Sequence, residues 1–269
     1  MEYMIQVEPE VYVYANDINP SGRKTILFLH GWPGNYKLFE YQYNRLCCLG
    51  YRCIGLDTRG FGNSDKPWGG YSYDRMADDV RCVIETLNLR DIVLCGHSTG
   101  GAIAIRYMAR HKGWGVSKLV LCAAAAPSLI QRPDFPYGLK AEDIQKMIQA
   151  TYADRPLMLR DFGSVFFHRK VSEPFSDWFF QLGLEAAPWS TIAVEKTWIK
   201  EVLFCDMDEI RVPTLILHGI HDQVCLYHLA VAQHCAIRNS VLIPFENSGH
   251  GLFYDEADKF NYELARFAE

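Results

Sequence analysis

The sequence predicts an α/β fold: a mostly parallel central sheet flanked by helices, with a helical cap inserted between two core strands. Apolar runs typical of buried strands alternate with segments of helical periodicity along most of the 269 residues. This alternation indicates a sheet covered by helices on both faces. Residues 128–207 differ, because they are helical in pattern, rich in aromatic residues and free of strand patterns. We therefore expect a core of residues 1–127 and 208–269 and a cap of residues 128–207.

The elements of the core follow from short apolar runs and the turn residues between them. Weak alternation over residues 7–15 predicts one or two edge strands, followed by a turn at 19–22. The remaining strands are expected at residues 25–29, 52–56, 91–95, 116–122, 213–217 and 241–243. Helices are expected at residues 36–49, 73–87, 102–109, 226–235 and 255–267, the second of them capped by Ser72.

Charge and cysteine content exclude several classes of protein. Acidic and basic residues are interspersed and the net charge is −5, so neither nucleic acid nor an anionic membrane is an expected partner. The N-terminus lacks the pattern of a signal peptide, and no apolar run approaches the roughly 20 residues of a membrane span. The nine cysteines include no C-x-x-C pair, which predicts free thiols in a cytoplasmic protein without a metal site or cofactor.

A glycine-rich turn between a strand and a helix carries the first candidate for chemistry. The sequence Gly96-His97-Ser98-Thr99-Gly100 follows the strand predicted at 91–95 and precedes the helix predicted at 102–109. Glycines at 96 and 100 remove Cβ atoms where the backbone crowds itself and allow a positive φ. The pattern G-x-S-x-G on such a turn is typical of a nucleophile elbow, in which Ser98 presents its hydroxyl at the N-terminal end of the helix.

Other reactive side chains also follow predicted strands, at the edge of a parallel sheet where ligands bind. Asp222 comes after the strand at 213–217, and His250 comes after the strand at 241–243. A nucleophilic serine needs a base to take its proton, and the base needs a carboxylate to orient it. Ser98, Asp222 and His250 are therefore the predicted catalytic triad, with Asp208 as an alternative carboxylate from the end of the cap.

Attack on a carbonyl group places negative charge on its oxygen, which requires preorganised hydrogen-bond donors. The backbone N–H of Thr99, directly after the serine, is expected to be one donor of this oxyanion hole. The loop His30-Gly31-Trp32-Pro33, after the strand at 25–29, is expected to supply the other. The N–H of Trp32 is placed for this role, whereas Pro33 has no N–H.

Further polar residues near the predicted site are expected to have structural roles. His97, His218 and His221 are predicted to pack or to orient loops, and no carboxylate or cysteine spacing around them indicates a metal site. Asp57 and Arg59 are predicted to tie down the glycine-rich loop in which they lie.

Most aromatic side chains of the cap are expected to form hydrophobic core, and some to face the cleft between cap and sheet. The predicted substrate-binding residues are Trp32, Phe162, Phe166 and Trp189. They indicate a largely apolar pocket for an acyl or aryl group.

Four motifs, at residues 30–33, 57–68, 96–101 and 248–252, together resemble one family. The chain is similar over nearly its whole length to the cofactor-free haloperoxidases, or perhydrolases, and aryl esterases of the α/β-hydrolase superfamily. The resemblance implies the α/β-hydrolase fold, the triad and oxyanion donors above, and carboxylesterase activity. It also implies a side reaction with peroxide, which is associated with members that carry the Trp-Pro pair. His97 departs from the family, because the haloperoxidases usually carry an aromatic residue there, and the cap is less clearly matched.

These observations predict a serine esterase that hydrolyses small acyl or aryl esters through an acyl-enzyme, with promiscuous perhydrolase activity as a further reaction. Ser98 at the elbow argues against haloalkane dehalogenases and epoxide hydrolases, which carry a carboxylate there. Two alternatives remain: a hydrolase of C–C bonds in aromatic ring-cleavage products, and a non-catalytic ligand receptor on the same scaffold. The expected partner is a small-molecule ester, and homo-oligomer formation is compatible with the sequence.

Overall fold

Strands and helices alternate along the chain in the computed structural model, which describes residues 1–269. The strands are β1 (Glu2–Glu8), β2 (Val11–Ile18), β3 (Thr25–Leu29), β4 (Arg52–Leu56), β5 (Ile92–His97), β6 (Val116–Cys122), β7 (Thr214–Gly219) and β8 (Ser240–Phe245). The helices are the 3₁₀ turn η1 (Tyr36–Phe39), α1 (Glu40–Cys48), α2 (Tyr73–Thr86), α3 (Thr99–Arg110), α4 (Ala141–Phe166), α5 (Glu173–Leu184), α6 (Pro188–Lys200), α7 (Phe204–Met207), α8 (Tyr227–Ala236), α9 (Leu252–Asp255) and α10 (Ala257–Ala268).

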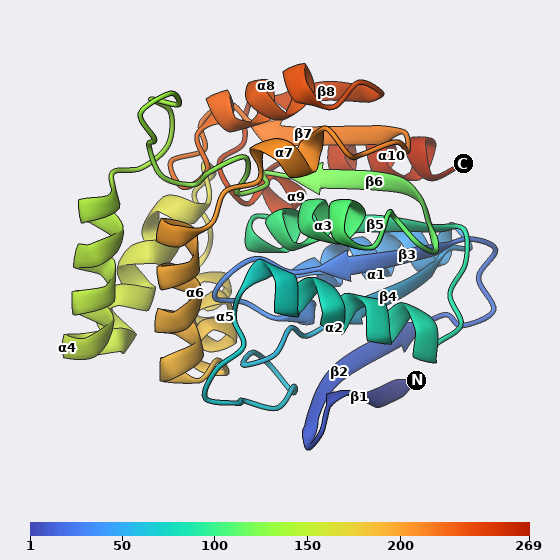
Figure 1. The fold of residues 1–269 in the computed structure, drawn as a ribbon, viewed down its shortest axis with the longest axis horizontal. Helices are drawn as coiled ribbons and strands as arrows, with labels where there is room; N and C mark the ends of the chain where they lie inside the picture. Colours follow the sequence, from blue (N-terminus) through green and yellow to red (C-terminus); the bar gives the residue numbers. More distant parts are fainter.

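The eight strands form one sheet in the order β1-β2-β4-β3-β5-β6-β7-β8 (Figure 1). Strands β1 and β2 form an antiparallel hairpin at one edge, and β2 also pairs antiparallel with β4. All other neighbouring strands are parallel. The predicted α/β fold with a mostly parallel sheet is therefore confirmed.

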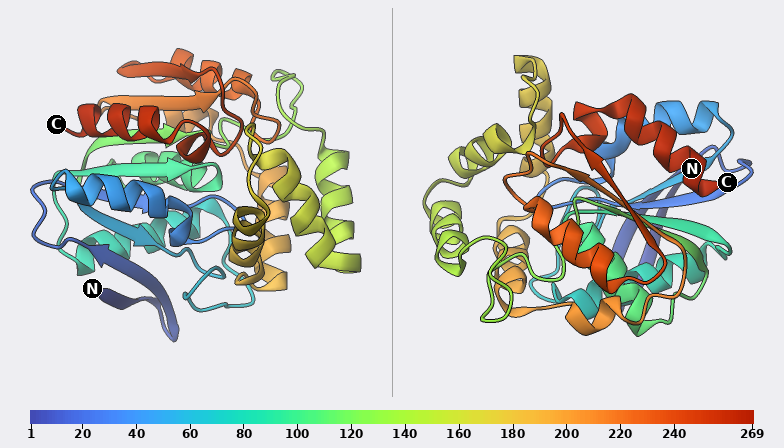
Figure 2. Two further views of the ribbon diagram at one scale, coloured as in Figure 1. Left: turned by 180° about the vertical axis from the view of Figure 1, so that it is seen from behind. Right: turned by 90° about the horizontal axis from the view of Figure 1, so that it is seen from above.

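Two hydrophobic clusters, one on each face of the sheet, hold the helices in place. Helices α2, α3 and α8 cover one face, whereas α1, α9 and α10 cover the other, as Figures 1 and 2 show from opposite sides. In β3, Leu27 and Leu29 belong to the first cluster and Ile26 and Phe28 to the second, and all four are fully buried. Burial on both faces explains why this strand is a continuous apolar run in the sequence.

Helices α4, α5 and α6 stand beside the edge of the sheet at which the parallel strands end (Figures 1 and 2). Two indole groups join α6 to the loops at this edge. Trp32 Nε1 donates to the Thr191 carbonyl oxygen at 3.2 Å, and Trp198 Nε1 donates to Thr99 Oγ1 at 3.0 Å. No helix of the chain has both the length and the apolar character needed to cross a membrane.

Helix α4 is interrupted at Asp154, which leaves the helical region with φ −154° and ψ 83°. The Asp154 carboxylate accepts the N–H of Leu157 at 3.0 Å, and Pro156 follows within the first turn. An aspartate cap and an early proline are typical of a helix start. The second half of α4, which carries Phe162 and Phe166, therefore begins as a new helix after a kink.

The structure differs from the predicted elements in four places. The edge strands expected within residues 7–15 extend beyond that range, since β1 begins at Glu2 and β2 ends at Ile18. The helix expected at 36–49 begins as η1 before α1. The last helix, expected at 255–267, is α10, and a short helix that was not expected, α9, precedes it; Glu256 leaves the helical region between the two. Residues 128–140 form no helix and contain two isolated β-bridges instead. Pro133 and Pro136 lack the N–H that a helix requires, and Gly138 has a φ of 107°.

Candidate active site

Ser98 lies on the turn between β5 and α3, with a φ of 53° and a ψ of −119° that are rare for a residue with a side chain. Its N–H donates to the Cys122 carbonyl oxygen at 2.9 Å, which fixes the turn to β6. The expected crowding is confirmed, since a Cβ at Gly100 would lie 2.3 Å from the Leu29 carbonyl oxygen. Neither Gly96 nor Gly100 uses the positive φ that glycine allows; the serine itself takes that conformation.

The loop after β3 closely approaches this turn. A Cβ at Gly31 would lie 2.8 Å from Ser98 Cβ and 2.5 Å from His97 Nδ1, so only glycine fits there. The backbone N–H of the next residue, Trp32, donates to no acceptor within the protein. Thr99 is the first residue of α3, so its N–H has no acceptor within the helix. The two predicted oxyanion donors thus lie on the two backbone segments that meet at the serine.

Asp222 and His250 share a buried hydrogen bond, with 2.8 Å between Asp222 Oδ2 and His250 Nδ1. The other carboxylate oxygen accepts the N–H groups of Val224 and Cys225, each at 2.8 Å. Burial alone would raise the pKa of Asp222, but His250 and His218 hold that pKa below its ordinary value. The ionised carboxylate only accepts, so Nδ1 of the neutral His250 ring carries the proton and Nε2 carries the lone pair.

The alternative carboxylate does not reach this pair. Asp208 is exposed directly after α7, where its backbone carbonyl oxygen accepts a hydrogen bond from Arg211. Of the two aspartates considered from the sequence, Asp222 is the one in contact with His250.

The Ser98 hydroxyl is not hydrogen-bonded to the imidazole. His250 Nε2 is buried without a partner, and Ser98 Oγ contacts Cys225 Sγ at 3.9 Å. Because the Cys225 N–H binds Asp222, this contact places the serine next to the acid–imidazole pair. Catalytic hydrogen bonds are commonly long before substrate binds and shorten in the complex. The structure therefore joins the acid to the imidazole and leaves the serine adjacent to them.

His97, next to the serine, binds the loop that carries His250. Its Nε2 lies 3.0 Å from the His250 backbone carbonyl oxygen, and the two ring centroids are 4.6 Å apart. A carbonyl oxygen only accepts, so Nε2 of His97 carries the proton. Burial lowers the pKa of His97 well below its ordinary value, which keeps the ring neutral.

The other two histidines orient loops, in agreement with their predicted role. His218 Nε2 lies 2.6 Å from the Cys225 carbonyl oxygen and 3.2 Å from Asp222 Oδ2, so it supports the turn that holds the carboxylate. The His221 ring stacks on His168, with 4.0 Å between centroids. Cys225 was not identified from the sequence as part of the site. Its position three residues after Asp222 is the one feature of the sequence that could have indicated it.

Aromatic side chains from α4 and α6 pack on the loop after β3. The Trp32 ring lies edge-to-face with Phe162 at 4.9 Å and with Trp198 at 5.0 Å. Phe166 is buried with its ring 4.9 Å from that of His250. The structure thus gathers three of the four predicted substrate-binding residues around the candidate site. The structure also places Trp198 there, although the sequence did not distinguish it from the other aromatic residues of the cap.

Trp189 lies elsewhere. Its indole N–H donates to the carbonyl oxygens of Lys66 and Pro67, at 3.2 and 3.0 Å, and its ring packs against Trp68 with a centroid distance of 5.6 Å. The groove that it lines contains none of the triad residues.

The glycine-rich loop after β4 is held as predicted. Asp57 accepts the N–H groups of Tyr36 and Asn63, at 2.7 and 2.8 Å, and burial raises the pKa of this carboxyl to about 7. Arg59, which is almost fully buried, forms a two-point ion pair with Asp79. Asp57 and Arg59 thus both bind other groups of the protein, as expected for residues that tie down the loop.

Comparisons with known proteins agree with this geometry. The family described as alpha/beta hydrolase fold matches residues 24–257. The chain is 48% identical over 268 residues to the AB hydrolase superfamily protein YisY of Bacillus subtilis, covering 100% of this chain and 99% of that protein. It is 31% identical to the bifunctional esterase/perhydrolase DCH of Acinetobacter calcoaceticus, with 96% of each chain covered.

Solved structures show the same similarity. The esterase EaEST of Exiguobacterium antarcticum superposes with a TM-score of 0.97 at 42% identity, covering 100% of this chain and 99% of that one. A bromoperoxidase of Bacillus anthracis superposes with a TM-score of 0.93 at 30% identity, covering 99% of each chain. The chain therefore belongs to the alpha/beta hydrolase fold family, among relatives named as esterases, perhydrolases and non-heme haloperoxidases.

Proposed function

We propose that this protein is a serine carboxylesterase that hydrolyses small acyl or aryl esters through an acyl-enzyme. The proposal rests on the buried pair of Asp222 and His250, whose 2.8 Å hydrogen bond leaves Nε2 free to accept a proton. Ser98 lies beside this pair on a turn of the kind that holds nucleophiles. Relatives named as an esterase and an esterase/perhydrolase, at 42% and 31% identity, support the same class of reaction.

In the proposed reaction, His250 Nε2 takes the proton of the Ser98 hydroxyl as its oxygen attacks the ester carbonyl carbon. The Asp222 carboxylate keeps the ring in the required tautomer and stabilises the imidazolium. The imidazolium then protonates the leaving alcohol, and the tetrahedral intermediate collapses to the acyl-enzyme. Water, deprotonated by His250, attacks the acyl group, and the serine leaves with its proton restored.

The backbone N–H groups of Trp32 and Thr99 are the proposed oxyanion donors. The close approach of Gly31 to Ser98 supports this assignment, because it brings the Trp32 backbone to the nucleophile turn. Loss of one such donor costs about 10²–10³ in rate. The Trp198 indole, which donates to Thr99 Oγ1, helps to hold the second donor in place.

The proposed acyl pocket is apolar, and residues 128–207, which lie between β6 and β7, are proposed to act as its cap. Trp32, Phe162 and Phe166 are the side chains assigned to it, which suits a short acyl or aryl group rather than a charged one. Because Trp189 faces the other side of α6, we assign it no part in ester binding.

Perhydrolysis is a second proposed reaction of the same site. Hydrogen peroxide would replace water as the nucleophile that attacks the acyl-enzyme, which releases a peracid and regenerates the serine. The relative of 31% identity named as a bifunctional esterase/perhydrolase supports this reaction. Peracid formation from acetate and peroxide, and its loss in Ser98→Ala, would test it.

The two alternatives receive less support. A hydrolase of C–C bonds in ring-cleavage products requires a polar cap pocket, whereas the rings against Trp32 are Phe162 and Trp198. A non-catalytic receptor would bind ligand without turnover, so the experiment below separates it from an esterase.

The decisive experiment measures turnover of p-nitrophenyl acetate and butyrate. We expect activity in the wild type, none above background in Ser98→Ala, and a loss of about 10³–10⁴-fold in kcat for Asp222→Asn. Asp208→Asn, a matched change at the exposed aspartate, should leave kcat unchanged. Equal rates for wild type and Ser98→Ala would reject the esterase and favour the receptor.

A further inference from the structure

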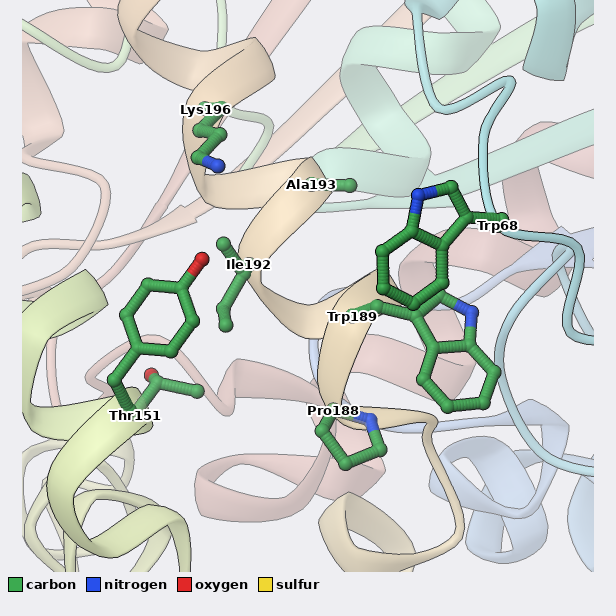
Figure 3. A pocket seen from close by; sticks show the side chains of 8 residues that line it. Trp68, Thr151, Pro188, Trp189, Ile192, Ala193 and Lys196 are labelled. Atoms are coloured by element: carbon green, nitrogen blue, oxygen red, sulfur yellow. The ribbon is translucent and has the colours of Figure 1, made fainter.

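A second concave surface lies on the side of α6 that faces away from Trp32. It is a groove of about 420 Å³ between α4, α6 and the loop after β4, within the usual size range of ligand pockets. Its lining residues, most of them labelled in Figure 3, are Trp68, Thr151, Tyr152, Pro188, Trp189, Ile192, Ala193 and Lys196. None of the proposed catalytic residues or oxyanion donors belongs to this set.

The groove exposes large aromatic side chains to solvent. Trp68 is 82% exposed and Tyr152 is 64% exposed, although neither is required for the core. The rings of Trp68 and Trp189 lie against each other on one side of the groove, whereas Ile192 lies between them and Thr151 (Figure 3). A cluster of exposed aromatic residues around a concave surface is typical of a binding site.

One ring of the groove is held in position before any ligand binds. The Trp189 indole N–H donates to the carbonyl oxygens of Lys66 and Pro67, which also ties the loop that carries Trp68 to α6. Rigid aromatic surfaces lose little conformational freedom on binding, so they favour planar aromatic ligands that stack on them.

The charge of the groove selects among aromatic ligands. Lys196 is exposed, forms no ion pair, and lies in Figure 3 on the same side of α6 as Ile192. No carboxylate lines the groove. The neighbouring Glu195 is buried, and burial raises its pKa to about 8, so its carboxyl group is mostly neutral at pH 7. The positive charge of the Lys196 ammonium is therefore not balanced by a neighbouring carboxylate, and it disfavours a cationic ligand.

We propose that this groove is a second, non-catalytic binding site for a planar aromatic carboxylate. The ring of the ligand would stack on Trp68 and Trp189 over the apolar floor at Ile192, and its carboxylate would pair with Lys196. The opposite side of the same helix carries Trp198, which contacts Trp32. A ligand in the groove is therefore separated from Ser98 by α6 and does not compete for the ester pocket.

The test uses 2-naphthoate as the probe and the Ser98→Ala protein, so that no turnover occurs. An NMR titration follows the indole N–H resonances of the six tryptophans. We expect saturable shifts with 2-naphthoate, and at least several-fold weaker binding of 2-naphthamide, which lacks the charge, and of cyclohexanecarboxylate, which lacks the aromatic plane. Added salt should weaken the binding of the two carboxylates and leave that of 2-naphthamide nearly unchanged.

Variants then locate the site. Trp68→Ala should weaken binding of 2-naphthoate about tenfold, since it removes a stacking surface. Lys196→Gln should weaken it about threefold, as expected for an exposed ion pair. Lys170→Gln, a matched change at an exposed lysine of the loop between α4 and α5, should have no effect. Both replaced residues of the groove are exposed, so folding should be retained, which circular dichroism checks.

Three results would overturn the proposal. The first is the absence of saturable binding. The second is binding that survives both Trp68→Ala and Lys196→Gln, which would place the ligand in another site such as the ester pocket. The third is a concentration-dependent dimer in light scattering that Trp68→Ala abolishes, which would make the groove an interface between two copies of the chain.

Discussion

The resemblance to the haloperoxidases singles out His97 as a departure from the expected aromatic residue, and His97→Phe tests what the imidazole contributes. The imidazole is fully buried, and its Nε2–H donates to the His250 carbonyl oxygen at 3.0 Å. Phe166 and Phe253 pack on the ring with centroid distances of 5.8 and 5.0 Å, so a phenyl ring fits the same surroundings. The substitution therefore removes one hydrogen bond and keeps the packing.

The expected loss follows from that hydrogen bond. A buried acceptor left without its donor costs about 1–3 kcal/mol, and about 1.4 kcal/mol corresponds to tenfold in rate. If the whole cost fell on the position of His250, kcat would fall by about 5- to 150-fold. Two other bonds also hold this loop: Gly251 N–H donates to the Phe166 carbonyl and Gly249 N–H to the Asp255 carboxylate, each at 2.9 Å. We therefore expect the lower part of that range, about tenfold.

The assay separates positioning from folding. For p-nitrophenyl butyrate, His97→Phe should lower kcat about tenfold and leave KM nearly unchanged, because the substitution acts on the proposed base and not on the proposed acyl pocket. The melting temperature should change little, because the phenyl ring removes the buried Nδ1 atom that lacks a partner in the wild type, which offsets the cost of the unpaired His250 carbonyl oxygen. His97→Gln places an amide N–H near the position of Nε2 and should restore most of kcat, whereas His97→Asn, whose amide corresponds to Nδ1, should not.

Wild-type kcat in His97→Phe would show that the contact with the His250 backbone is dispensable. A fall in kcat that parallels a fall in melting temperature across all three variants would assign His97 to stability alone. In either case the positioning role would be rejected.

Three further predictions concern stability and the support of the site. Burial raises the pKa of Glu195 to about 8, so the folded protein binds this proton more tightly than the unfolded chain does. The resulting stabilisation is complete below about pH 4 and is lost as the pH rises through 8. In scanning calorimetry between pH 6 and 9, the melting temperature of the wild type should therefore fall by several degrees more than that of Glu195→Gln. Arg59→Met breaks the buried ion pair with Asp79 and should lower the free energy of unfolding, measured in urea, by about 3 kcal/mol. This value is near the lower end for a broken buried pair, because Arg75 keeps its contact with Asp79. Adding Asp79→Asn should recover part of the loss, and an Arg59→Met protein as stable as the wild type would contradict the reasoning. Trp198→Phe keeps an aromatic ring but removes the hydrogen bond to Thr99, so kcat should fall about fivefold. The smaller ring leaves part of a buried space empty, so stability should fall modestly as well. An unchanged kcat would show that this bond does not support the site.

The sequence predicted the fold well wherever one local pattern decides the structure. Strands β3, β4 and β6 lie where the apolar runs predicted them, because most of their residues are buried on both faces of the sheet and are therefore apolar. The start of α2 was also predicted, since Ser72 caps it by accepting the N–H of Arg75. Residues 128–140 were predicted less well, because a segment with prolines can retain an apolar, helix-like composition without forming a helix.

The candidate site was predictable in part, for a similar reason. Asp222 and His250 follow strands whose order in the sheet is set by the fold, so their meeting could be expected from chain position. Cys225 and Trp198 could not be identified in this way, because their contacts with Ser98 and Thr99 depend on how one side chain fills space across two elements. No spacing rule along the chain encodes such a contact.

The buried polar atoms without a partner give a physical reason for the arrangement of the site. Such atoms cost about 1–3 kcal/mol each, so folded proteins contain few of them. Three of those in this chain are His250 Nε2, His218 Nδ1 and His97 Nδ1. His250 and His218 contact the Asp222 carboxylate, and His97 contacts the backbone of His250. The carboxylate itself is fully engaged by His250 Nδ1 and by two backbone N–H groups, which fixes one side of the imidazole. The ring is therefore oriented through Nδ1 while the lone pair of Nε2 has no partner within the protein, which is the arrangement that the proposed general base requires.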